Sequence, residues 1–294
     1  MNTPNTSGIA SGFDALIPPE MAAKAESVGV KKSTTGGRTL FLLAVLAGAF
    51  IALGAVFATT ITAAPGSGLP FGVSKLLGGL AFCVGLILVI VAGAELFTGN
   101  NLIVMAWAGK NVSTGQLLKN WSIVYLGNFV GSVSTAVLML FTRQYTFAGG
   151  SIGLNALNIA GAKCGFDFIQ AVALGIMCNA LVCMAVWLCF SARSTTDKIL
   201  SIIFPITAFV AAGFEHCIAN MYFIPFGLLV KGTAPAAYWE SIGKTAADYS
   251  SLTWSNFLVA NLLPVTIGNI IGGAVLVGLI YWFVYLRKQP AASS

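Results

Sequence analysis

The chain has 294 residues, of which 57% are hydrophobic and only 8% carry a charge. A soluble globular domain has about 25% charged residues, so this composition excludes a soluble globule and indicates an integral membrane protein. The net charge of +6 gives no reason to expect nucleic-acid binding, because no basic cluster in the sequence is interleaved with aromatic residues.

Residues 1–37 form a polar arm ahead of the first apolar run. Pro18 and Pro19 precede an Ala-rich stretch, which favours a short amphipathic helix that begins near Glu20; the alternative is a disordered tail. A signal peptide is disfavoured because the apolar run begins late, near Leu40, and is long. We expect the arm to act as a movable plug at the cytoplasmic mouth, and its deletion (residues 1–35) to leave the pore folded but weaken closure at acidic pH.

Six apolar stretches follow the arm, and each is long enough for a helix that crosses about 30 Å of hydrocarbon. They are 39–62, 75–94, 121–142, 168–190, 199–230 (interrupted) and 254–286. The membrane domain is therefore expected to cover residues 38–290, with a Gly-rich linker at 143–167 between two halves.

Lysine and arginine positions predict that both termini are cytoplasmic, because these residues are retained on that side of a membrane. With this orientation ten of them lie inside and five outside. The inside set is Lys24, Lys31, Lys32, Arg38, Lys110, Lys119, Arg193, Lys198, Arg287 and Lys288. The outside set is Lys75, Arg143, Lys163, Lys231 and Lys244.

Two patterns occur once in each half of the chain. AGAELFTGN (92–100) and AGFEHCIAN (212–220) both read A-G-x-E-x-x-x-[G/A]-N, which pairs Glu95 with Glu215 and Asn100 with Asn220. NWSIVYLGNFVG (120–131) and NLLPVTIGNIIG (261–272) both read N-x6-G-N-x-x-G. Matched patterns in the same order indicate an internal repeat, with repeat one at about 38–145 and repeat two at about 165–287.

The first pattern interrupts the middle span of each half. Three spans per half require the two halves to be inverted relative to one another. Unwound backbone at membrane depth is tolerated only inside protein or beside water, so the two breaks are expected to meet near the membrane midplane. Each break aims a half-helix N-terminus at that point, and the partial positive charge there favours a small anion.

Thr98 and His216, the only histidine, fall within the two breaks and are candidate donors to a bound anion. Ionisable residues inside a membrane are rare and functional by default, although a hydrogen-bonded core residue is the alternative for His216. An unperturbed imidazole has a pKa of about 6.5, so His216 is expected to make transport depend on pH.

The other polar residues of the repeats have candidate structural roles. Glu95 and Glu215 are predicted to cap the half-helix that follows each break. Asn179 and Asn269 are candidates either for structural hydrogen bonding or for lining the pore, and Asn128 is the repeat partner of Asn269. The six cysteines have no C-x-x-C spacing, so we expect no metal and no cofactor.

The segments FDALIPPEMAAKAESVGV, AELFTGNNLIV, GFEHCIANMYFIP and NLLPVTIGNIIGG resemble the formate/nitrite transporter family, most closely its formate channel branch. The resemblance runs from Phe13 to Arg287. It implies an all-α, aquaporin-like bundle of six spans that assembles as a homopentamer, with one pore per protomer, in the bacterial inner membrane.

The resemblance also implies residue roles. Phe82, Leu86 and Phe209 would form apolar constrictions, and Leu96, Phe97 and Thr98 would form the central site together with His216. Lys163 would attract anions from outside, with Lys32 as its inner counterpart.

The function expected from these observations is a pH-dependent channel for formate. A nitrite or hydrosulfide channel and an aquaporin-like pore for neutral solutes remain as alternatives, and transport of the anion alone or with a proton is left open. An intramembrane enzyme is disfavoured because the sequence has neither H-E-x-x-H nor G-x-S-x-G.

Overall fold

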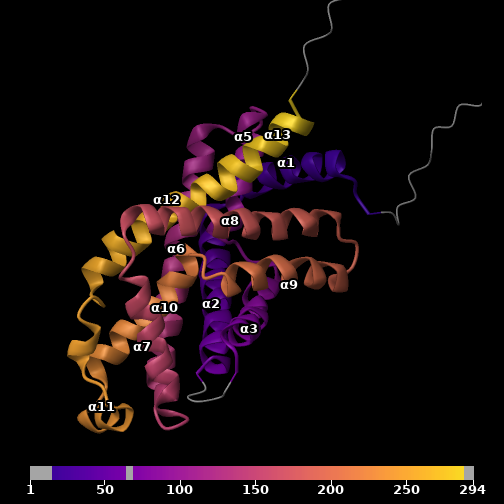
Figure 1. Ribbon diagram of the computed structural model, residues 1–294. Coiled ribbons are helices and arrows are strands. Elements are labelled where there is room, and N and C mark those ends of the chain that lie inside the picture. The colour runs from indigo at the N-terminus through magenta and orange to yellow at the C-terminus, as the bar shows by residue number, and fades with distance from the viewer. Residues whose placement is uncertain (1–14, 64–68, 288–294) are drawn as a thin grey trace, which may run out of the picture.

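The computed structural model describes residues 15–63 and 69–287, and all regular structure in these ranges is helical (Figure 1). The first fourteen residues of the predicted arm, part of the turn after the first span and Lys288 lie outside the described residues.

The first half of the chain forms a short helix, two long helices, a broken segment and a third long helix. These are α1 (Pro18–Thr34), α2 (Gly37–Ile61), α3 (Phe71–Ala92), α4 (Phe97–Asn100), η1 (Asn101–Ile103), α5 (Val104–Ala108) and α6 (Thr114–Phe141).

The second half repeats this order after η2 (Gln144–Thr146). Its elements are α7 (Ser151–Lys163), α8 (Phe168–Ser191), α9 (Thr195–Ala211), α10 (Cys217–Thr233), α11 (Ala236–Ile242) and η3 (Ala246–Tyr249). The last helix is wound partly as π-helix and comprises η4 (Asn256–Leu262), α12 (Leu263–Ile270), η5 (Ile271–Leu279) and α13 (Ile280–Tyr285).

Five helices are long and apolar enough to cross a membrane, and a bent pair made of α10 and α11 brings the number to six among the described residues. The predicted interrupted span at 199–230 is present as α9 and α10, with 212–216 between them. Polar residues fix where spans begin: Ser113 caps α6, Asp167 caps α8 and Ser194 caps α9, each by accepting a backbone N–H. The predicted all-helical membrane fold is confirmed.

Glycines of the second repeated pattern allow the outer spans of each half to cross closely. A Cβ atom on Gly131 of α6 would overlap the backbone oxygen of Val45 in α2. In the second half, a Cβ atom on Gly272 of η5 would overlap the backbone oxygen of Ile176 in α8. Small residues at helix crossings are how membrane helices gain packing without a hydrophobic driving force.

The predicted linker at 143–167 is wrong as an unstructured connection, because it contains the 13-residue helix α7. Its small residues pack closely rather than forming a flexible loop: Ala160 meets Gly227 of α10, where no Cβ would fit. Glycine has a low helix propensity, and tertiary packing overrides it here.

The N-terminal helix α1 belongs to the packed structure. Met21, Ala22 and Ala25 are buried in a cluster with Met105 and Trp187, and Figure 1 shows α1 beside α5 and α13. Deletion of residues 1–35 is therefore no longer expected to leave the pore folded, because it would expose this apolar cluster.

Candidate functional site

Each broken span turns at a glycine that follows an alanine in the repeated pattern. Gly93 has a φ of 83° at the end of α3, and Gly213 has a φ of 76° after α9. This left-handed conformation favours glycine, since it has no Cβ to clash. The extended residues that follow are tied to the preceding span: Glu95 N donates to Leu43 O at 3.2 Å, and Glu215 N donates to Leu174 O at 3.3 Å.

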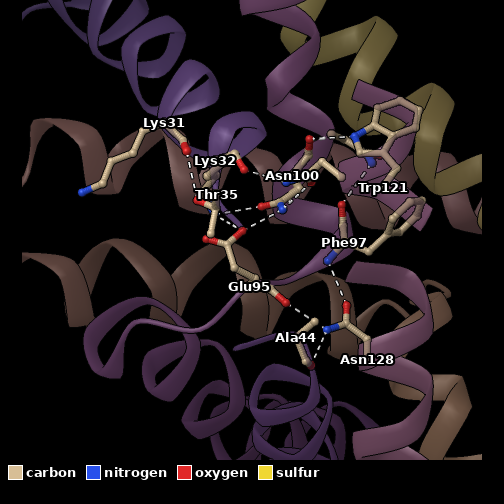
Figure 2. A network of polar contacts seen from close by, with 11 residues as sticks. Lys31, Lys32, Thr35, Ala44, Glu95, Phe97, Asn100, Trp121 and Asn128 are labelled. Carbon is tan, nitrogen blue, oxygen red and sulfur yellow. Dashed lines mark hydrogen bonds and ion pairs between the residues drawn. The ribbon is translucent and has the colours of Figure 1, made fainter. Parts of the chain in front are cut away.

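Asn128 secures the first break with all of its amide groups (Figure 2). Its Oδ1 accepts from the backbone N of Phe97 at 2.9 Å, and its Nδ2 donates to Ala44 O at 2.7 Å and Glu95 O at 2.9 Å. The asparagine thereby supplies partners for backbone groups that have no water to bind at this depth.

Asn269 does the same at the second break. Its Oδ1 accepts from Cys217 N at 2.9 Å, and its Nδ2 donates to Gly175 O at 2.8 Å and Glu215 O at 2.9 Å. The first N–H groups of both half-helices are thus bound by asparagines, and the prediction that Glu95 and Glu215 cap these helices is wrong.

The carboxylate of Glu95 instead binds an ammonium and an amide (Figure 2). Lys32 Nζ lies 2.8 Å from Glu95 Oε2 and 2.8 Å from Asn100 Oδ1. Asn100 Nδ2 donates to Glu95 Oε2 at 2.8 Å and to Asn120 Oδ1 at 2.9 Å. The predicted anion-attracting Lys32 is therefore paired with a carboxylate.

An equivalent cluster stands at the second break. Lys163 Nζ lies 2.6 Å from Glu215 Oε1, and Asn220 Nδ2 donates to Glu215 Oε2 at 2.7 Å and to Asn261 Oδ1 at 2.7 Å. The two clusters differ in one contact. Lys163 binds the other carboxylate oxygen, and Asn220 Oδ1 has no hydrogen-bond partner among the described residues.

Asn100 and Asn220 were predicted to lie in the breaks, but they lie in α4 and in the first turn of α10. Asn120 and Asn261 open the second repeated pattern and complete the two clusters. Their function was not predicted. Their recurrence at the same place in both repeats was the signal that marked them as equivalent.

Thr98 and His216 meet across the two halves. Thr98 Oγ1 lies 2.9 Å from His216 Nε2, and both side chains are buried. His216 is the N-cap of α10, and its Nδ1 accepts from Ala219 N at 3.1 Å. Because Nδ1 is an acceptor, the proton of the neutral imidazole is assigned to Nε2, which donates to Thr98. The hydroxyl proton of Thr98 then remains available to a ligand.

Asn179 supports Thr98 from α8. Its Nδ2 donates to Asn269 O at 2.7 Å, to Asn101 Oδ1 at 2.9 Å and to Thr98 O at 3.3 Å. Of the two functions left open for Asn179 and Asn269, the contacts favour structural hydrogen bonding. Phe97 also faces the packed interior, where its ring centroid lies 4.9 Å from that of Tyr125.

Two cavities approach this pair from opposite sides. The first, which we call the α1-side cavity, has a volume of about 270 Å³ and is lined by Lys32, Leu86, Glu95 and Leu96 among others. The second, the α7-side cavity, measures about 240 Å³ and is lined by Phe82, Lys163, Phe209, Glu215 and His216 among others. Thr98 lies between them, because its neighbours Leu96 and Gly99 line the first cavity and its partner His216 lines the second.

The predicted apolar constriction residues separate into two groups. Phe82 and Phe209 meet edge to face with ring centroids 5.7 Å apart, beside the ring of His216. Leu86 lies one turn further along α3 and lines the other cavity. No group of three or more His, Cys, Asp or Glu side chains in the described ranges is placed to hold a metal ion.

Comparison with known proteins places this geometry in a family. The family model described as Formate/nitrite transporter matches residues 19–283. The formate channel FocA of Escherichia coli (strain K12) is 48% identical over 277 residues, which cover 94% of this chain and 97% of that one. The formate channel FocA of Haemophilus influenzae is 42% identical and covers 90% of this chain and 93% of that protein.

A solved structure described as a pentameric formate channel with formate bound has a TM-score of 0.81 to this chain. It is 49% identical in sequence, and the match covers 85% of this chain and 98% of the other. The chain belongs to the formate/nitrite transporter family.

Proposed function

We propose that this protein is a channel for formate, with a pore that connects the two cavities through the Thr98–His216 pair. The observation that carries the proposal is this pair of hydrogen-bond donors, 2.9 Å apart between two apolar constrictions. The names of the similar proteins and of the similar solved structure support formate as the substrate.

The apolar constrictions make the central donors necessary. An anion that passes Leu86 or the Phe82–Phe209 contact must lose most of its water, which is costly unless other donors replace it. The hydroxyl of Thr98 and the Nε2–H group of His216 are those donors. The half-helix ends add only their dipoles, because their first N–H groups are bound by Asn128 and Asn269.

His216 gives the pore a route to pH dependence. Its Nε2 proton can pass to the anion, so that a neutral acid leaves across the second constriction with a smaller desolvation cost. A proton added at Nδ1 would instead break the hydrogen bond from Ala219 N. The proton route therefore runs through Nε2, on the side of Thr98.

The assembly and location follow from the same comparisons. We propose a homopentamer with one pore per protomer, in the bacterial inner membrane, that acts in transport and not as an enzyme. With both termini cytoplasmic, the α1-side cavity opens inward and the α7-side cavity opens outward.

Flux into proteoliposomes tests the function. Purified protein should pass formate down its gradient and exclude glycerol, with nitrite and hydrosulfide as competing substrates. Glycerol passage equal to that of formate would replace the proposal by a neutral-solute pore. A large preference for nitrite or hydrosulfide would move the substrate within the family.

Cysteine labelling tests the orientation. Thr146 and Thr196 are exposed at the two ends of the bundle, whereas Ser151 is buried by α7 packing and is unsuited to labelling. All six native cysteines are buried, which keeps the background low. We expect an impermeant maleimide to label Thr146→Cys from outside and Thr196→Cys from inside. Labelling of both from one side would contradict the inverted repeat.

Leu86→Ala tests the constriction on the α1 side. Leu86 is buried where it lines the cavity, so a smaller side chain should widen and wet the neck. We expect faster formate flux and entry of acetate, both measured in liposomes. The control is Leu157→Ala, a buried leucine of α7 that lines neither cavity. A variant at Leu86 with unchanged rate and selectivity would place the constriction elsewhere.

A further inference from the structure

The lysine that faces the anion path on the α7 side is neutralised. Lys163 Nζ lies 2.6 Å from Glu215 Oε1, and the two side chains are 15% and 3% exposed. A pair this close has no net charge, so at longer range its field is that of a dipole and falls off steeply. Attraction of anions into this cavity requires a charge that no carboxylate cancels.

Lys75 is such a charge. It lies in the first two turns of α3, is partly exposed, and lines the α7-side cavity. Its ammonium stands 5.4 Å from the ring centroid of Phe71, and it makes no hydrogen bond or ion pair within residues 15–63 and 69–287. Its N–H donors are therefore available.

The two cavities differ in charge as a result. On the α1 side the charged lining residues are Lys32 and Glu95, which sum to +1 − 1 = 0. On the α7 side they are Lys75, Lys163 and Glu215, which sum to +2 − 1 = +1 with His216 neutral.

Other polar groups near the mouth of the α7-side cavity are already engaged. The hydroxyls of Thr59 and Thr62 donate to Ala55 O and Ala58 O of their own helix, each at 2.8 Å. Asn155 donates to Thr59 O and Thr62 Oγ1. Lys75 is therefore the group in this wall with donors to offer an arriving anion.

We propose that Lys75, rather than the neutralised Lys163, recruits small monovalent anions to the α7-side cavity. This inference rests on the proposed function only in assuming that anions use this cavity. Its physical basis is the local potential of one unpaired charge at a concave mouth, which raises the local anion concentration and is screened by salt.

The test measures the local potential directly and needs no formate flux. A cysteine is placed at Thr62, in the wall of the same cavity, and is modified by an anionic and by a cationic methanethiosulfonate reagent. Lys75→Gln should lower the ratio of the anionic to the cationic rate by roughly fivefold at low ionic strength, and Lys75→Arg should keep it. Lys244→Gln, which removes a lysine that lines neither cavity, should leave it unchanged.

Two results would overturn the proposal. One is a rate ratio that is the same with Lys75 and with Gln at this position. The other is a ratio, in the protein that retains Lys75, that does not fall as ionic strength rises. A normal charge effect in a protein without formate flux would keep Lys75 as the recruiting residue and reject the proposed substrate.

Discussion

Lys163→Met is expected to destabilise the protein by about 3 kcal/mol, because it leaves a nearly buried carboxylate without its cation. Glu215 is 3% exposed, and its remaining partners are the amides of Asn220 and Asn261. Methionine keeps most of the apolar stem of the lysine, so the loss reports the charge. Thermal unfolding in detergent micelles, followed by tryptophan fluorescence, should show a clearly lower midpoint.

Two further variants separate charge from packing. Adding Glu215→Gln to Lys163→Met should recover most of the midpoint, because the unpaired charge is removed while both amide donors keep an acceptor. Lys32→Met should cost less than Lys163→Met, because the Lys32–Glu95 pair is more exposed, at 27% and 14%. A double variant no more stable than Lys163→Met alone would show that the ion pair is not the cause.

His216→Phe is expected to abolish the coupling of formate movement to pH while the protein still assembles. Phenylalanine fits beside Phe209, whose ring is 5.9 Å from the imidazole, but it removes the Nε2 proton and the cap on Ala219 N. Loss of the cap costs about 1 kcal/mol, which a packed bundle tolerates. The measurement is formate flux against pH in liposomes.

His216→Asn is the matched control. Its side-chain oxygen can accept from Ala219 N and its amide N–H can donate to Thr98, so both contacts of the imidazole have a substitute without a titrating group. We expect anion passage that does not change with pH. A Phe variant with the profile of the native protein would return His216 to a structural role.

The sequence was sufficient to predict the spans, the two breaks and the residues that recur in them. Apolar length and the repeated A-G-x-E pattern carry that information, because glycine is needed at the turn and an inverted pair of breaks must bury its backbone. The pairing of Thr98 with His216 was also within reach, since both lie in the breaks and the breaks were expected to meet.

The partners of the repeated side chains could not be predicted in the same way. Lys32 and Lys163 reach Glu95 and Glu215 across 63 and 52 residues, from helices whose packing the sequence pattern does not specify. Without these lysines in view, a carboxylate beside a helix start looks like a cap.

Repetition identifies which residues are equivalent but not what they contact. Asn120 and Asn261 recurred in both halves, yet their place in the two clusters appeared only in the structure. The helix α7 was hidden for a different reason, since its glycines look like linker residues until the surface they pack against is known.

Formate flux through Thr98→Val tests the central claim, that the Thr98–His216 pair replaces the water an anion loses in the pore. Valine keeps the shape of threonine and removes the hydroxyl. A lost hydrogen bond to a charged group costs about 1.5–3 kcal/mol, so formate flux should fall about tenfold or more. Thr135→Val is the control, because its hydroxyl bonds within α6 and lines neither cavity. Flux through Thr98→Val equal to that of the native protein and the control would contradict the account.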